Sequence, residues 1–318
     1  MARSTHQDLA VPDGAVEGAT AVSGHPMGSV ALNLLLSLRP AQWTKNLLVF
    51  AGLIFALRLF DPAAVLTAVA AFVVFCALSG AVYLINDVAD RESDRRHPLK
   101  SRRPIAAGVV SVRLAVSVAA GLSIVALAAA FLISRPFGLV ALAYVSLQGL
   151  YSGPLKHVVI VDVLTLAIGF VLRAVAGAVA IDVSISHWLL VCTILGALFM
   201  ALAKRRHELV LLADGATSHR PILGEYSPYL LDQMISVVTA STLVAYIFYT
   251  ISPETAEKFG TAWLGLTIPF PLYGIFRYLY LVHQREGGGS PSDLLLNDRP
   301  LLACVALWVV AVVLIIYG

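Results

Sequence analysis

Residues 63–94 read AAVLTAVAAFVVFCALSGAVYLINDVADRESD. The first part, Ala63–Ile85, carries no charged side chain and is long enough to cross the hydrocarbon core of a bilayer as a helix. Asn86, Asp87, Asp90 and Asp94 follow directly after it. The stretch therefore predicts a transmembrane helix that ends in a cluster of carboxylates.

The composition extends this prediction to the whole chain. Of 318 residues, 59% are hydrophobic and only 13% are charged, and the mean hydropathy is +0.85, which is typical of an integral membrane protein. Apolar stretches recur at about Leu47–Leu59, Ala63–Ile85, Val112–Ile133, Phe137–Leu150, Val159–Ile181, Trp188–Ala203, Tyr229–Ile251, Ala262–Val282 and Leu301–Tyr317. We predict an all-α membrane protein, a bundle of nine transmembrane helices.

The distribution of Lys and Arg predicts the orientation of this bundle. Cytoplasmic connections of membrane proteins carry an excess of both residues. In the nine-helix arrangement one side holds most of them, whereas the other side holds Arg58, Arg135 and Lys258. We therefore expect a cytoplasmic N-terminus, an external C-terminus and an acidic segment that faces the cytoplasm from the cell membrane.

The remaining regions suggest one catalytic domain. Residues 1–30 are polar and rich in Gly, Ala and Ser, so we expect a disordered cytoplasmic tail before a single domain over residues 31–318. Small residues such as Gly169 and Gly177 allow close helix packing within one bundle or between subunits, so a homo-oligomer stays open. We expect lipid and small-molecule partners and no nucleic acid.

The acidic segment is the first candidate site. If the helix continues past Leu84, then Asp87, Asp90 and Asp94 stand at i, i+3 and i+7 and share one face with Asn86. Like charges on one face are unfavourable unless a cation joins them, and hard oxygen ligands suit Mg²⁺ together with the oxygens of a diphosphate. The alternative is a solvated helix end without a function.

A basic loop follows the acids. Lys100, Arg102 and Arg103 crowd a short segment that Pro98 and Pro104 keep from forming a helix. Arg forks suit bidentate phosphate contacts and Lys supplies a point charge, so the loop can fold over the metal and hold phosphate oxygens. The alternative is that these cations only fix the membrane topology.

Charged residues inside the later spans are further candidates. Asp162 lies in or at the mouth of the fifth span, where a carboxylate is costly and usually functional. Arg173 follows on nearly the same helical face, so the two side chains can support one cavity; alternatively, Arg173 pairs with another helix for structural reasons. Tyr151 and Lys156 occupy the turn before this span, and Lys45 either snorkels or reaches the same cytoplasmic pocket.

The end of the sixth span carries a basic motif, Lys204-Arg205-Arg206-His207-Glu208. Three cations and one carboxylate suit a phosphate group better than a second metal. The alternative is again a common basic run at a cytoplasmic helix end.

Together the motif Asn86-Asp87-x-x-Asp90-x-x-x-Asp94, the loop with Arg103-Pro104-Ile105 and Gly108, and the nine-span pattern resemble the UbiA superfamily of intramembrane prenyltransferases over about residues 35–318. The resemblance implies a helical bundle in which the acidic motif holds Mg²⁺ against a diphosphate and whose lipid-facing side admits a prenyl chain. Usual members carry a second Asp-rich motif after the sixth span, where this chain has Lys204–Glu208 instead.

At this position the chain is similar to one branch of the superfamily, the actinobacterial decaprenyl-phosphate phosphoribosyltransferases, whose product supplies cell-wall arabinan. The similarity also rests on Arg39-Pro-x-Gln-Trp-Thr-Lys-Asn46, Tyr151-Ser-x-x-Leu-Lys156 and Asp162-Val163. It implies a 5-phosphoribosyl-1-diphosphate donor and a decaprenyl (polyprenyl) phosphate acceptor. The implied metal site is Asn86, Asp87, Asp90 and Asp94, and the implied substrate contacts are Lys45, Asn86, Lys100, Arg102, Arg103, Tyr151, Lys156, Asp162, Lys204, Arg205, Arg206 and Glu208.

Two alternatives remain at this point. A prenyl-diphosphate-dependent transferase that acts on an aromatic acceptor also needs Mg²⁺ but breaks a different bond. A lipid or anion transporter would spread its charges through the membrane depth, whereas these charges gather on the cytoplasmic side.

Overall fold

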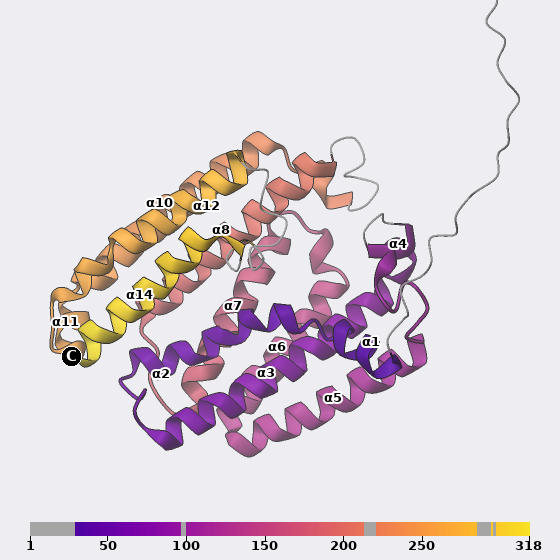
Figure 1. The fold of residues 1–318 in the computed structure, drawn as a ribbon, viewed down its shortest axis with the longest axis horizontal. Helices are drawn as coiled ribbons and strands as arrows, with labels where there is room; N and C mark the ends of the chain where they lie inside the picture. Colours follow the sequence, from indigo (N-terminus) through magenta and orange to yellow (C-terminus); the bar gives the residue numbers. More distant parts are fainter. Residues whose placement is uncertain (1–28, 97–99, 213–220, 285–293, 295–296) are drawn as a thin grey trace, which may run out of the picture.

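The computed structural model describes residues 29–96, 100–212, 221–284, 294 and 297–318 (Figure 1). Within these ranges every regular element is helical and no strand forms, which confirms the all-α fold class. Most of the predicted tail, residues 1–28, lies outside the described residues, and the single domain over residues 31–318 stays a prediction.

The helices occupy the predicted apolar stretches. In chain order the elements, with η for 3₁₀ helices, are α1 (Val30–Ser37), η1 (Pro40–Phe50), α2 (Ala51–Phe55), α3 (Pro62–Ala89), α4 (Arg91–Arg96), η2 (Lys100–Arg102), α5 (Val112–Ile133), α6 (Arg135–Ser152), η3 (Leu155–His157), α7 (Val161–Ala180), α8 (His187–Leu212), η5 (Pro221–Glu225), α10 (Pro228–Ile251), α11 (Pro253–Phe259), η6 (Trp263–Thr267), α12 (Pro269–Gln284) and α14 (Arg299–Tyr317).

Six of these helices are long and apolar enough to cross a membrane: α3, α5, α7, α8, α10 and α14. A seventh candidate is the pair formed by α11 and the segment Trp263–Gln284, which is bent by 102°. The stretches predicted as the first and fourth spans are also helical, as η1 with α2 and as α6, but neither is among these candidates. The described residues thus support six or seven crossings, and the count of nine and the orientation stay predictions.

The helix starts follow from local sequence. Asp61 caps α3 by accepting hydrogen bonds from two N–H groups of the first turn, and Pro62 follows at the first helical position. Ser111, Ser134 and Ser227 cap α5, α6 and α10 by accepting from the N–H three residues later. Because each cap stands directly before an apolar run, the sequence predicts where these helices begin.

Small residues let the first segment pack closely against α7. A Cβ added to Gly177 would lie 1.8 Å from the carbonyl oxygen of Val49, and one added to Gly52 would lie 2.9 Å from the Cα of Ala178. The backbones of η1 and α2 therefore contact α7 with no side chain between them. Gly177 and Ala178 serve packing inside the chain.

The two ends of the bundle differ. Figure 1 shows α4 and the end of α3 at one end, whereas α14 finishes at the opposite end, beside α11. This placement agrees with the expectation that the acidic segment and the C-terminus lie on opposite faces. The candidate residues of the acidic segment therefore gather at the end of the bundle away from the C-terminus.

Candidate active site

The acidic segment is a helix with a break in it. α3 continues past Leu84 but ends at Ala89, and Asp90, with φ −91° and ψ 7°, separates it from α4. The expectation of three carboxylates on one uninterrupted helix is therefore wrong at Asp90. Asp87 and Asp94 are each 3% exposed, whereas the Asp90 side chain is 46% exposed.

Asp87 and Asp94 converge on one cation. The Nη1 atom of Arg103 lies 3.1 Å from Asp87 Oδ1 and 2.6 Å from Asp94 Oδ2. Arg39 forms a second ion pair with Asp87. The two buried carboxylates thus share the Arg103 guanidinium, and Asp87 has a second one from Arg39, which precedes α3 in the sequence.

The loop that carries Arg103 is packed onto the helix end. Ile105, Ala106 and Val110 are buried, and Ile105 and Val110 pack into one apolar cluster with Leu84. Arg95 Nε also donates to the Ala106 carbonyl at 2.9 Å. The loop therefore folds over the acids as the sequence predicts for Arg103, whereas Lys100 and Arg102 lie at its exposed start.

Two further contacts tie the acids to the turn after α6. Lys156 Nζ lies 3.2 Å from Asp90 Oδ1. Ser152 donates its hydroxyl to the side-chain oxygen of Asn86 and, at 2.8 Å, to the carbonyl of Gln148. We call Asp87, Asp90 and Asp94, with their partners Arg39, Arg103 and Lys156, the acidic cluster. Lys45, which the sequence also suggested, is half-buried in η1.

A second cluster surrounds Asp162 at the start of α7. Arg205 Nε donates to Asp162 Oδ2 at 2.8 Å, Nη1 donates to Glu208 Oε2 at 2.8 Å, and Nη2 donates to the Tyr151 hydroxyl at 3.2 Å. The Arg205 and Asp162 side chains are 1% and 0% exposed. Each nitrogen of this guanidinium therefore has a protein partner, and Arg205 joins three of the predicted site residues.

Tyr226 completes this cluster and was not among the predicted residues. Its hydroxyl donates to Asp162 Oδ1 at 2.8 Å and accepts from the Ile160 N–H at 2.7 Å. Burial raises the pKa of Tyr226 to about 12, so the hydroxyl stays protonated and keeps donating near neutral pH. We call Asp162, Arg205, Glu208, Tyr151 and Tyr226 the Asp162 cluster.

The basic motif of α8 does not act as one unit. Arg206, the neighbour of Arg205, pairs instead with Asp232 of α10. Consecutive residues on a helix point about 100° apart, which separates the two guanidinium groups. Lys204 lies 3.8 Å from Glu208. The prediction that these three cations hold one phosphate together is therefore not supported by their placement.

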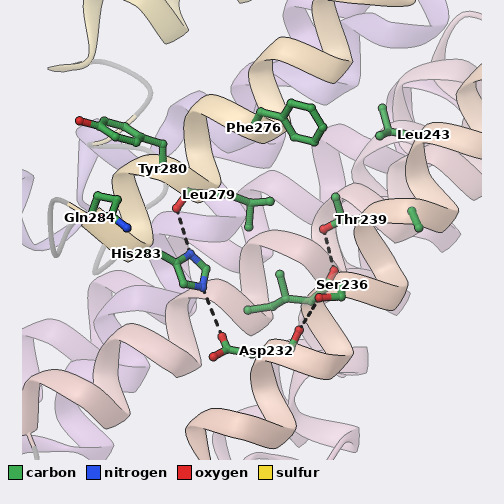
Figure 2. Close-up of a pocket in the computed structure, with 11 residues that line it drawn as sticks. Asp232, Ser236, Thr239, Leu243, Phe276, Leu279, Tyr280, His283 and Gln284 are labelled. Atoms are coloured by element: carbon green, nitrogen blue, oxygen red, sulfur yellow. Dashed lines mark hydrogen bonds and ion pairs between the residues drawn. The ribbon is translucent and has the colours of Figure 1, made fainter.

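The Arg206 contact borders a groove of about 610 Å³ between α10 and α12. Figure 2 shows His283 and Asp232 facing each other at one end of this groove and Phe276 and Leu243 toward the other end. His283 Nε2 lies 3.3 Å from Asp232 Oδ1. The residues that line this groove belong to neither the acidic cluster nor the residues that Arg205 contacts, so the groove is distinct from both.

The predicted cavity between Asp162 and Arg173 is also not formed by direct contact. Asp162 pairs with Arg205, whereas Arg173 donates to Asn46, Tyr144 and the Gly169 carbonyl. The two charged residues of α7 therefore belong to different layers of the bundle.

The acidic cluster has the donor chemistry for a divalent metal. In the part of the chain that the structure describes, no three His, Cys, Asp or Glu residues are close enough to hold a metal ion. Asp87 and Asp94 nevertheless direct oxygens at one position, which the Arg103 nitrogen fills. Two carboxylate oxygens directed at one position are donors that fit Mg²⁺, and Asp87 and Asp94 are residues that would hold it.

Comparison with known proteins identifies the family. Residues 46–296 match the UbiA prenyltransferase family. The chain belongs to that family. UbiA proteins of solved structure share its fold: a UbiA homolog from Archaeoglobus fulgidus, solved bound to GPP and Mg²⁺, has a TM-score of 0.69 at 19% identity and covers 90% of this chain and 100% of its own.

Two UbiA relatives are more similar in sequence. A decaprenyl-phosphate phosphoribosyltransferase of Mycobacterium tuberculosis is 36% identical over 294 residues, 90% of this chain and 95% of that protein. Another of Corynebacterium glutamicum is 33% identical over 297 residues, 92% of this chain and 89% of that protein. The UbiA chain described here is therefore an enzyme that transfers a group, which argues against the transporter alternative.

Proposed function

We propose that this enzyme transfers the 5-phosphoribosyl group from 5-phosphoribosyl-1-diphosphate to decaprenyl phosphate, or a similar polyprenyl phosphate, and releases diphosphate. The observation that carries the proposal is the convergence of Asp87 and Asp94 on one cation beside Arg39 and Lys156. This arrangement suits a metal-bound diphosphate. The relatives named as phosphoribosyltransferases, at 33–36% identity, favour a sugar as the group transferred.

The Asp162 cluster supports a sugar over a second metal. Asp162 and Glu208 carry two negative charges, and Arg205 and Lys204, which both contact Glu208, carry two positive charges. Arg205 is 1% exposed and each of its nitrogens has a partner, so it is not placed to release these carboxylates to a second divalent ion. The Glu208 side chain is 25% exposed, and its carboxylate suits a ribose hydroxyl, which can donate a hydrogen bond and carries no charge.

In the proposed mechanism, Asp87, Asp90 and Asp94 would hold a Mg²⁺ ion, which when bound would supply positive charge beside the leaving diphosphate. The charge on the diphosphate oxygens is neutralised by Arg39, Arg103 and Lys156. These three side chains turn from their carboxylate partners to the diphosphate. Glu208 orients the ribose, and the buried Asp162 holds Arg205 in position beside it. The anomeric carbon of the ribose gains positive character as its C–O bond to diphosphate breaks and the acceptor phosphate oxygen bonds to it. The acceptor phosphate is already anionic near neutral pH, so positioning and electrostatics suffice and no general base is needed.

The second candidate is a prenyl-diphosphate-dependent transferase that acts on an aromatic acceptor. The family name and the solved UbiA homologs bound to GPP and to DMAPP favour it. The same acidic cluster would serve this reaction, and the two candidates differ in the bond that breaks. The basic motif at Lys204–Glu208 and the named relatives favour the phosphoribosyl donor.

We also propose that the site faces the cytoplasm in the cell membrane, within a nine-span bundle, and that the product enters the arabinan pathway of an actinobacterial cell wall. The excess of Lys and Arg at the end that holds the acidic cluster supports this orientation. A water-soluble donor made in the cytoplasm then reaches the acids directly.

The test is a transfer assay with purified protein in detergent. Radiolabelled 5-phosphoribosyl-1-diphosphate, decaprenyl phosphate and Mg²⁺ are incubated together, and the label that enters the lipid phase is counted. We expect label in the lipid that disappears when Mg²⁺ is chelated. A parallel reaction offers geranylgeranyl diphosphate and 4-hydroxybenzoate; product there, and none from the phosphoribosyl donor, would establish the second candidate instead.

A further inference from the structure

Arg173 is a buried cation that forms no ion pair with any acidic residue that the structure describes. It lies within α7, and only 5% of the residue is exposed. Its Nε donates to Asn46 Oδ1 at 2.8 Å, Nη1 to the Gly169 carbonyl at 2.9 Å and Nη2 to the Tyr144 hydroxyl at 2.8 Å. All three acceptors are neutral.

The other buried charges behave differently. Among the described residues, Asp87, Asp94, Asp162 and Arg205 are buried and each has an oppositely charged partner. Arg173 instead lies over the rings of Tyr144 and Phe170, and its Cζ is 4.8 and 5.2 Å from their centroids. A charge buried in a membrane span is costly, and such residues usually face a substrate path.

The hydrogen bonds of Arg173 to described residues use three of its five N–H groups. A guanidinium has five N–H groups, one on Nε and two on each Nη. The three bonds to described residues use one on each nitrogen, so one N–H remains on Nη1 and one on Nη2. Two N–H groups on one guanidinium can bind two oxygens of a phosphate.

Arg173 lies below the acidic cluster along α3. Asn46, its hydrogen-bond partner, also donates to Ser79 Oγ at 3.1 Å. Ser79 and Asp87 are eight residues apart in the same helix, which corresponds to about 12 Å along its axis. Between these levels, Arg39 lies over the ring of Tyr83, with its Cζ 4.9 Å from the centroid. The Arg173 layer is therefore deeper in the bundle than the acids.

The proposed reaction involves two phosphate monoesters besides the diphosphate: the 5-phosphate of the donor and the phosphate of the lipid. We expect Lys204, Arg205 and Arg206 to bind one of them from the sequence, but Arg205 is 1% exposed with a partner on each nitrogen, and Arg206 pairs with Asp232 of α10. The lipid phosphate must attack opposite the leaving diphosphate, and the lipid arrives from the bilayer, so its phosphate approaches from the deeper side.

We infer that Arg173, positioned by Asn46 and Tyr144, binds a phosphate monoester, and that the polyprenyl phosphate supplies it. This inference rests on the proposed function for the identity of the lipid, although binding is measured without turnover. Arg173 is then a substrate-binding residue in the deeper layer of the bundle, whereas the acidic cluster binds the diphosphate nearer the end of the bundle.

The decisive variant is Asn46→Asp. It keeps Arg173 in place and gives the guanidinium a carboxylate of nearly the same size as the amide it replaces. If Arg173 binds phosphate, the new carboxylate competes with the ligand and weakens binding. If Arg173 only holds helices together, the added ion pair leaves phosphate binding unchanged.

Isothermal titration calorimetry with farnesyl phosphate and ribose 5-phosphate as separate probes tests this directly. We expect Asn46→Asp to weaken farnesyl phosphate binding about tenfold or more, the magnitude of a lost charge-assisted hydrogen bond, with ribose 5-phosphate unaffected. Weakening of ribose 5-phosphate alone would assign the site to the donor's 5-phosphate. Unchanged binding of both probes, or no binding of either by the wild type, would overturn the inference.

Two further variants separate binding from folding. Arg173→Lys keeps the charge and should retain part of the farnesyl phosphate affinity, whereas Arg173→Met should lose it. Thr250→Val is the matched control, because this buried hydroxyl in α10 donates to the Ile247 carbonyl of its own helix and to no other residue that the structure describes. In the transfer assay, an inactive wild type would refute the proposed function, whereas an active wild type with unchanged probe binding in Asn46→Asp would refute only the Arg173 assignment.

Discussion

The acidic cluster and the Asp162 cluster hold the same kinds of side chain in different ways. In the first, the cations Arg39, Arg103 and Lys156 are 25–29% exposed and reach the carboxylates from flexible side chains. In the second, Arg205 is 1% exposed and each of its nitrogens has a partner within the bundle. The acidic cluster can therefore exchange its cations for a metal and a diphosphate. The Asp162 cluster is instead a fixed frame, because its cation is buried and bonded through every nitrogen.

Replacing Asp87 with Asn should have the largest effect on activity. It removes one of the two carboxylates that converge on the proposed metal position, so we expect turnover to fall at least about a thousandfold. Phosphoribosyl transfer measured at saturating donor checks this. The melting temperature in detergent should change little, because Arg103 keeps Asp94 as a partner. Near wild-type turnover would show that the acidic cluster does not hold the metal.

Replacing Arg205 with Met should have the largest effect on stability. The change leaves Asp162 in the bundle without its cation, and breaking a buried ion pair costs about 3–5 kcal/mol. Thermal unfolding in detergent measures the loss. The matched control is Arg206→Met, whose partner Asp232 is more exposed and which we expect to destabilise far less. Equal melting temperatures for the two variants would contradict the idea of a fixed frame.

The sequence predicted the acidic cluster better than the Asp162 cluster, for physical reasons. The three aspartates are close together in the chain, and their spacing alone indicates a shared site. Arg39 and Tyr226 join the clusters from segments that are distant in sequence. The motif that begins at Arg39 gave no reason to pair it with Asp87, and no local pattern marks Tyr226. The different directions of Arg205 and Arg206 follow from the helical period, but their partners depend on how α7 and α10 pack against α8.

The break at Asp90 and the division of the predicted first span between η1 and α2 are two further features that local sequence patterns did not predict. Apolar runs and caps predict where helices lie, because both signals are local. The end of α3 at Ala89 brings Asp87 and Asp94 to Arg103 and leaves Asp90 to Lys156, an arrangement that depends on two later loops. The predicted first and fourth spans are helical but are not among the membrane-spanning candidates: the first is divided between η1 and the short α2, and α6, at 18 residues, is long enough but not apolar enough.

Arg103→Gln should have an intermediate effect and sharpen the comparison. The side chain is partly exposed, so its ion pairs contribute about 1 kcal/mol or less to stability. The substitution should affect donor binding more than stability, because we expect the Arg103 side chain to move from the carboxylates to the diphosphate. A rise of about tenfold in the donor KM, with the acceptor KM unchanged, is the expected kinetic result. An unchanged donor KM would mean that Arg103 only neutralises the acids.

Tyr226→Phe should have the smallest effect of the four. It removes the hydroxyl that donates to Asp162 and accepts from Ile160, at a cost of about 1–2 kcal/mol in stability. Thermal unfolding and donor KM measured together check the prediction, and both should change modestly. A loss of turnover as large as that of Asp87→Asn would show that Tyr226 contacts the reacting atoms.

The most direct test of the central claim is metal binding by electron paramagnetic resonance, with Mn²⁺ in place of Mg²⁺. We predict that wild-type protein with 5-phosphoribosyl-1-diphosphate immobilises the ion, that Asp87→Asn abolishes this signal, and that Tyr226→Phe retains it. Immobilised Mn²⁺ of equal amount in wild type and Asp87→Asn would contradict the assignment of the acidic cluster as the metal and diphosphate site.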